Sequence, residues 1–180
     1  MSIMEIIENI KQRLGRLYLS ADKAEKVNRY SQPFAKIENI GVLYEANRDD
    51  METVKKYAAK LRAEGKKVFE LGYYDQKELV FDINYTLHSE YIHKKHIQWN
   101  GLPQTDIASG FKSENFDLLL NLYTSDSLPL FYVSLHSKAK FRIGKYVKKN
   151  ITFFDMMIDN GESKDLDNLI KQIDYYIRKL

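Results

Sequence analysis

Residues 40–73 have the sequence IGVLYEANRDDMETVKKYAAKLRAEGKKVFELGY. The first seven of these residues are mostly apolar and form a run of the length of a buried strand. Polar residues suited to a helix start follow at 47–50, and apolar residues then recur at helical spacing over 54–61. Gly65 suits the position just after a helix end, and 68–73 is a second apolar run. The pattern predicts strand, helix and strand, a unit whose crossover is right-handed in about 98% of cases.

The second half of the chain repeats this alternation. Residues 116–123 are too apolar for a strand with one face in water, and Ser127 and Pro129 suit the start of a helix that runs to about His136. Further strands are predicted at 139–144 and 151–158, short edge strands at 79–81 and 91–93, and a closing helix whose apolar face is Leu166, Leu169, Ile170, Ile173, Tyr176 and Ile177. The expected fold class is α/β, a Rossmann-like three-layer sandwich with a mainly parallel sheet and an added amino-terminal helix.

Residues 1–36 are expected to form an amino-terminal helical segment and connector, and residues 37–180 the Rossmann-like domain. Apolar residues recur every three or four positions in the first helix, at Ile3, Ile6, Ile7, Ile10, Leu14 and Leu17. We expect this stripe to pack on the domain. The alternatives are a detachable helix for a protein partner or for an anionic membrane surface, and acidic residues on the same helix make the membrane the weaker of these two.

Composition and charge exclude several classes. The chain has a formal net charge of +3, which lies within residues 1–36, because 37–180 hold 21 basic and 21 acidic residues. A nucleic-acid-binding domain usually has an excess of basic residues over its surface, and residues 37–180 have none, so no nucleic-acid partner is expected. The absence of cysteine excludes disulfides, thiolate metal sites and a thiol nucleophile. No apolar run is long enough to span a bilayer, and the start lacks a signal-peptide pattern, so we expect a cytoplasmic protein.

The run FDLLLNLYTSDSLPLFYVSLHSKAKFRIGKY at 116–146, together with QWNGLP at 98–103 and VLYEA at 42–46, resembles an uncharacterised bacterial family of small α/β proteins, a domain of unknown function. This resemblance implies a fold and no activity. Residues 116–144 are also similar to the amino-terminal half of heptosyltransferase-type glycosyltransferases. This chain, however, has Asn121 where an Asp is usual and no counterpart of the second domain, so that activity is not expected.

Two loops are candidates for a ligand site, because parallel sheets bind ligands beyond the carboxyl ends of strands where the strand order reverses. Their polar residues are Asn47, Arg48 and Asp49 in one loop and Thr124, Ser125, Asp126 and Ser127 in the other. If the two turns open side by side, backbone N–H groups, the serine hydroxyls and the Arg48 cation could hold a phosphate or carboxylate. The alternative is that these residues only cap helices, which is the commoner role for such residues.

Other signatures are missing from the sequence. There is no Gly-rich dinucleotide fingerprint, no phosphate-binding P-loop and no nucleophile elbow, so no cofactor is predicted. His88, His93 and His96 lie close in sequence, but on an extended chain His93 and His96 point to opposite sides, so no metal is predicted.

These observations favour a binding domain, without assembled catalytic groups, for a partner protein or a small anionic ligand. The alternative is a transferase acting on a phosphorylated or sugar substrate. The sequence assigns neither an oligomeric state nor an enzyme class.

Overall fold

The computed structural model describes residues 3–21, 27–76 and 88–180. Six strands in these residues form one sheet in the order β3-β2-β1-β4-β5-β6, and every neighbouring pair is parallel. The strands are β1 (Asn39–Glu45), β2 (Lys67–Tyr74), β3 (Ser89–His93), β4 (Leu118–Leu122), β5 (Arg142–Lys145) and β6 (Met156–Ile158). The predicted Rossmann-like α/β fold is therefore confirmed.

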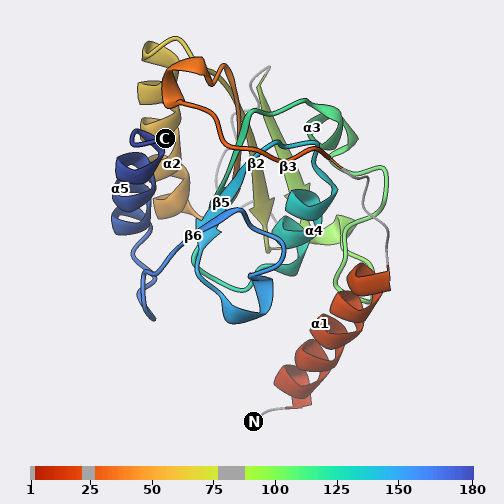
Figure 1. Ribbon diagram of the computed structural model, residues 1–180. Coiled ribbons are helices and arrows are strands. Elements are labelled where there is room, and N and C mark those ends of the chain that lie inside the picture. The colour runs from red at the N-terminus through yellow and green to blue at the C-terminus, as the bar shows by residue number, and fades with distance from the viewer. Residues whose placement is uncertain (1–2, 22–26, 77–87) are drawn as a thin grey trace.

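Helices cover both faces of the sheet (Figure 1). The α-helices are α1 (Ile3–Ala21), α2 (Arg48–Ala63), α3 (Ser109–Ser113), α4 (Leu128–His136) and α5 (Leu166–Ile177), and η1 (Phe34–Lys36), η2 (Lys94–His96) and η3 (Lys148–Asn150) are short 3-10 turns. One core cluster joins α2 and α5 to the sheet, and a second joins α3 and α4 to the opposite face. Helix α1 lies outside these three layers and contacts α4.

Local sequence explains the βαβ unit that contains β1, α2 and β2. Alternate residues of β1 face the two layers: Tyr44 belongs to the α2 and α5 cluster, and Leu43 to the α4 cluster. The Asn47 side chain caps α2 by accepting a hydrogen bond of 2.9 Å from the Asp50 N–H. Gly65 follows the helix with φ +83°, a conformation that glycine adopts without a steric penalty.

Two predicted strands were too long. The strand predicted at 151–158 is confirmed only over Met156–Ile158, because residues 151–153 form a turn from which Phe153 and Phe154 pack on Phe131 of α4. The strand predicted at 139–144 begins only at Arg142. Both segments are apolar, and burial against a helix from a turn gives the same sequence pattern as burial within a strand.

The described part of the region between residues 75 and 115 contains an edge strand, β3, which continues the parallel order beside β2. It contains the strand predicted at 91–93. The other predicted edge strand, at 79–81, lies outside the described residues. The chain then turns through residues 97–103, where Ile97 and Pro103 form an isolated antiparallel bridge.

The apolar stripe of α1 does not pack on the domain as predicted. Ile6, Ile7, Ile10 and Leu17 are all exposed, and Leu14 is half-buried. Among the helix residues whose side chains are described, Gly15 and Leu19, on another side, are the buried ones. Gly15 packs so closely on Asn100 and Leu128 that a Cβ atom there would lie 2.5 Å from each. The helix therefore docks by close backbone approach at Gly15 together with burial of the Leu19 side chain in the cluster that contains α4. None of the described helices is long and apolar enough to cross a membrane.

Candidate functional site

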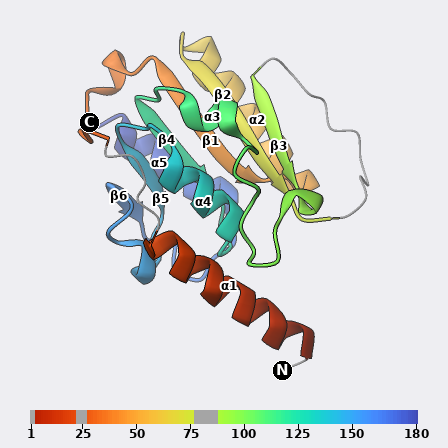
Figure 2. The same ribbon diagram turned by 90° about the vertical axis from the view of Figure 1, so that its right-hand side faces the viewer.

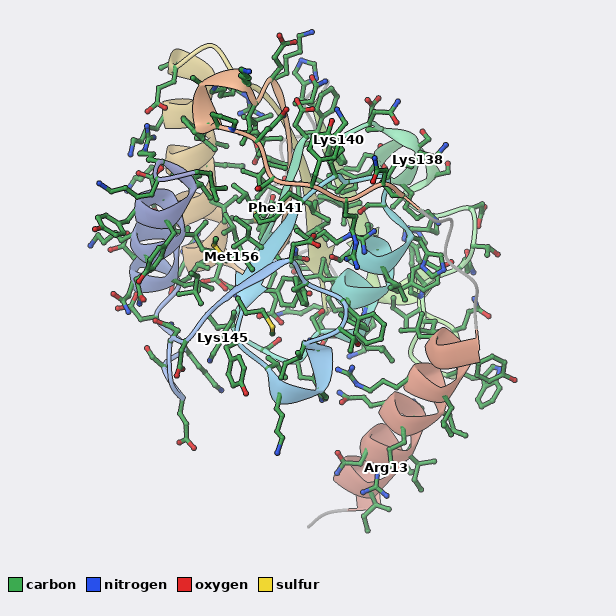
Figure 3. All side chains as sticks on the ribbon, viewed as in Figure 1. Arg13, Lys138, Lys140, Phe141, Lys145 and Met156 are labelled. Carbon is green, nitrogen blue, oxygen red and sulfur yellow. The ribbon has the colours of Figure 1, made fainter. Side chains whose placement is uncertain are left out.

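The strand order reverses between β1 and β4, which are neighbours in the sheet. From β1 the chain continues into α2 on one face, and from β4 it continues into α4 on the other. The two predicted loops therefore start from adjacent strand ends at the carboxyl edge, as expected for a switch point. Figure 3 labels residues near the two ends of β5. Lys145, the last residue of the strand, lies at the carboxyl edge of the sheet, and Lys140, which precedes the strand, lies at the opposite edge.

Glu45 and Ser125 join the two loops. The Ser125 hydroxyl donates a hydrogen bond to Oε1 of Glu45, the last residue of β1. Burial raises the pKa of the Glu45 carboxyl above its usual range, and the hydrogen bond from Ser125 only partly opposes this effect. The prediction that the turns after Ala46 and Tyr123 open side by side is thus confirmed. A partly buried carboxylate, absent from the predicted set, lies between them.

A cleft of about 560 Å³ lies on the β1 and β2 side of this bond. It is lined by Glu45, Ala46, Asn47, Arg48, Tyr73, Tyr74, Asp75 and Gln76. Arg48 is exposed, and no ion pair joins it to an acid in the described part of the chain. Asp75 accepts a hydrogen bond of 2.8 Å from the Tyr73 hydroxyl and forms an ion pair with Lys94. The cleft thus combines one cation with two carboxylates and two phenols.

The remaining polar residues of the first loop stabilise α2. Asn47 binds Asp50 twice, through its side-chain oxygen to the backbone N–H and through its Nδ2 to the carboxylate at 2.5 Å. Asp49 lies in the first turn of α2, where an acid interacts favourably with the helix dipole. Asn47 is the cap of α2, whereas Asp49 makes no capping contact and lies in the first turn. Of the three predicted residues of this loop, Asn47 and Arg48 line the cleft, and Arg48 is the charged one.

The second loop borders a separate, narrow cavity of about 10 Å³ between β4 and the residues after β5. Three oxygen atoms around it are buried and have no hydrogen-bond partner among the described residues: Asn121 Oδ1, Tyr123 OH and Ser127 Oγ. Burial raises the pKa of the Tyr123 hydroxyl, which keeps it protonated. Ser127 precedes α4 as predicted, but its side chain makes no capping hydrogen bond. The cavity has the volume of about one water molecule, which is too small for a phosphate.

Asp126 is already neutralised by two cations. It forms ion pairs with Arg16 of α1 and with Lys149 of η3. The Arg16 guanidinium also lies 5.2 Å from the centre of the Phe131 ring, and its Nη1 donates to Asn150 at 3.4 Å. Asp126 therefore attaches α1 to the domain, and Thr124 beside it is half-buried. The seven predicted residues share one edge of the sheet but do not line one pocket.

The histidines do not form a metal site. The backbone N–H of His93 donates a hydrogen bond to the ring Nδ1 of His96, and the centres of the two rings lie 5.4 Å apart in an edge-to-face arrangement. His88 packs separately on the Phe69 ring at 5.0 Å. Over residues 3–21, 27–76 and 88–180 there is no group of three or more potential ligands that could hold a metal ion.

The chain was compared with models of protein families. The model of DUF6913, a family of unknown function, matches residues 11–180. The chain belongs to the DUF6913 family. No curated protein and no solved structure matches the chain. These comparisons support the resemblance to a domain of unknown function, and they support neither the likeness to glycosyltransferases nor a bacterial source.

Sequence reasoning missed three contributors to the site of this DUF6913 protein. Glu45 gave a visible signal, since it is an acid at the end of an otherwise apolar strand. Arg16 gave no signal in the sequence, because its partner Asp126 lies 110 positions further along the chain. Tyr123 was read as part of the buried strand, and nothing local indicated that its hydroxyl would lack a partner. The DUF6913 match begins at residue 11, so it includes the half of α1 that contacts the domain.

Proposed function

We propose that this protein binds a small anionic ligand in the cleft that Arg48 shares with Glu45. The observation that carries the proposal is an exposed guanidinium, without an acidic partner among the described residues, in a 560 Å³ cleft at the switch point of a parallel sheet. Ligand sites commonly have volumes of about 300–1,000 Å³. A guanidinium binds a carboxylate or a phosphate through two parallel hydrogen bonds.

The rest of the lining narrows the chemistry of the ligand. Glu45 and Asp75 would repel a ligand that carries negative charge throughout, but they accept hydrogen bonds from hydroxyl or ammonium groups. Tyr73, which is half-buried, offers apolar ring surface beside its phenol oxygen, whereas Tyr74 is almost fully buried beside the cleft. We therefore infer a ligand with one anionic group, which would face Arg48, and hydroxyl or ammonium groups on its other side. Sugar phosphates and amino acids have this pattern.

The test is isothermal titration of the wild type with inorganic phosphate, a hexose phosphate, a dicarboxylate and an amino acid. We expect at least one probe to bind and Arg48→Ala to weaken that binding by about tenfold or more, since a charged hydrogen-bonded pair is lost. Arg13→Ala removes the same charge from the exposed side of α1 and is expected to leave the affinity unchanged. Equal affinity in wild type and Arg48→Ala, or no binding of any probe, would refute the proposal.

The alternative function, transfer of a group to or from a phosphorylated or sugar substrate, needs polar groups of both loops in one pocket. Arg48 and Ser125 line different hollows, with Glu45 between them. Glu45 is the candidate general base in the cleft, because burial raises the pKa of its carboxyl above the usual range. Ser125, whose hydroxyl donates to Glu45, does not line this cleft, and none of the described lining residues is a serine, threonine or lysine, so we favour binding over catalysis.

A further inference from the structure

The amino-terminal end of α4 adjoins the small cavity beside β4, because Ser127 and Phe131 both line that cavity. The first hydrogen bond of the helix runs from the Phe131 N–H to the Ser127 carbonyl oxygen at 3.0 Å. The N–H groups of Leu128 and Leu130 precede that bond and have no partner within the helix, and Pro129 has no N–H. This end of the helix therefore carries partial positive charge at the cavity.

Three buried oxygen atoms around the cavity lack hydrogen-bond partners among the described residues. Asn121, Tyr123 and Ser127, which carry them, are 1%, 8% and 7% exposed. The Asn121 amide is held in one orientation, because its Nδ2 donates to the Ile143 carbonyl oxygen at 3.0 Å, and its Oδ1 is left as an acceptor. The two hydroxyls can each donate one hydrogen bond. Because buried polar groups in folded proteins are nearly always paired, these atoms indicate a ligand that accepts two hydrogen bonds and donates one.

The surroundings of the cavity have an excess of positive charge. Helix α1 lies beside α4 (Figures 1 and 2) and contacts it. From α1, Arg16 pairs with Asp126, an acid of the cavity lining that Lys149 also neutralises. Lys145 belongs to the lining as well, and Glu45 at the end of β1 adds a second acid nearby. These three cations outnumber the two acids, so the charge and the helix end together favour an anion.

The size of the cavity limits what can enter it to one atom of about the size of a water molecule. Its volume is about 10 Å³, so a whole phosphate or sulfate ion cannot enter, but a single oxygen atom of such an ion can. That oxygen has to accept hydrogen bonds from Tyr123 and Ser127 and donate one to Asn121. A hydroxyl oxygen does both, whereas a deprotonated oxygen only accepts. A water molecule has the same pattern but makes no use of the positive charge.

We propose that the start of α4 binds inorganic phosphate, with one P–OH group in the cavity and the other oxygen atoms outside it. The Tyr123 and Ser127 hydroxyls donate to the oxygen of this group, and its proton is donated to Asn121 Oδ1. Inorganic phosphate keeps a hydroxyl at neutral pH, whereas sulfate has none, and a phosphate monoester loses most of its hydroxyl above a pKa of about 6. The site therefore selects inorganic phosphate over both. This inference does not rest on the Arg48 cleft.

Isothermal titration of the full chain in a phosphate-free buffer, with inorganic phosphate and with sulfate, tests the proposal. We expect phosphate to bind about tenfold more tightly than sulfate, or better. Ser127→Ala removes one donor and should weaken phosphate binding by about tenfold, and it should keep its fold because this side chain makes no capping hydrogen bond. Tyr44→Phe, the control, removes a buried hydroxyl from the other face of the sheet and should leave the phosphate affinity unchanged. No phosphate binding, or equal binding of sulfate, would overturn the proposal.

Two further comparisons separate this site from the Arg48 cleft and from a structural effect. Phosphate binding that is lost in Ser127→Ala and kept in Arg48→Ala belongs to the start of α4, and the cleft is then tested by the other probes. Binding that is lost in Arg48→Ala and kept in Ser127→Ala would overturn this proposal and leave the cleft proposal standing. Phosphate should also raise the Tm of wild type more than that of Tyr123→Phe, since a ligand stabilises the folded state in proportion to its affinity. An equal rise in the two proteins would contradict the role of the Tyr123 hydroxyl.

Discussion

At the scale of single residues, two buried tyrosines differ in one hydrogen bond. The Tyr44 hydroxyl lies 3.2 Å from that of Tyr91, whereas the Tyr123 hydroxyl has no partner among the described residues. We expect Tyr44→Phe to lower the free energy of unfolding by about 1 kcal/mol, because a buried hydrogen bond is lost. We expect Tyr123→Phe to raise it by up to about 1 kcal/mol, because an unsatisfied buried hydroxyl is removed. Urea denaturation measures both, and a Tyr123→Phe protein less stable than wild type would contradict the second expectation.

At the scale of elements, Asp117 ties together the starts of three strands. Its Oδ2 accepts hydrogen bonds of 2.9 and 3.0 Å from the Glu38 and Asn39 N–H groups at β1, and its Oδ1 binds Lys140 before β5 at 2.8 Å. Burial raises the pKa of Asp117, but the backbone N–H groups and the Lys140 ammonium outweigh it, so the net pKa is lowered. Asp117→Asn should therefore destabilise the protein by about 2 kcal/mol at neutral pH.

The pH dependence of this effect follows from the lowered pKa. A carboxyl whose pKa is lower in the folded state stabilises the fold above its unfolded pKa of about 3.9, and this stabilisation is lost as the pH falls through the folded pKa. The difference between wild type and Asp117→Asn should thus shrink below about pH 4, as followed by thermal unfolding over a pH series. Asp167→Asn is the control, since its ion pair with Lys171 is exposed and should contribute little. A difference in stability between wild type and Asp117→Asn that stays constant to low pH would contradict a lowered pKa of Asp117 in the folded protein.

At the scale of the whole molecule, α1 divides into a part that contacts the domain and a part that does not. Deleting residues 1–10 should shift Tm by less than about 2 °C, since Ile6, Ile7 and Ile10 are exposed. Deleting 1–21 should lower Tm by roughly 5 °C or more, because Leu102 and Leu128 lose their cover and Leu19 is removed. Differential scanning calorimetry measures the Tm of both truncated proteins. Equal losses would show that the first turns also pack on the domain.

The sequence determined the elements and the way they alternate. The strand, helix and strand of residues 40–73 were predictable because burial, capping at Asn47 and the left-handed Gly65 all act between residues close in the chain. The same local rules placed β4 and the start of α4, and the rule for parallel sheets placed the two loops at one edge. Local rules are ambiguous at residues 151–153. Their pattern predicts a strand, whereas the structure has a turn there from which Phe153 packs on α4.

Tertiary structure decided how these parts meet. An apolar stripe shows that a helix has an apolar side, but not which side docks, and in α1 the docking side was set by Gly15 and by the pairing of Arg16 with Asp126. The two loops of the candidate site are likewise joined by one contact, from Ser125 to Glu45, between residues 80 positions apart. Such contacts depend on the relative placement of elements already formed. The periodicity of neighbouring residues shows which side of an element is apolar. It carries no information on which distant surface covers that side.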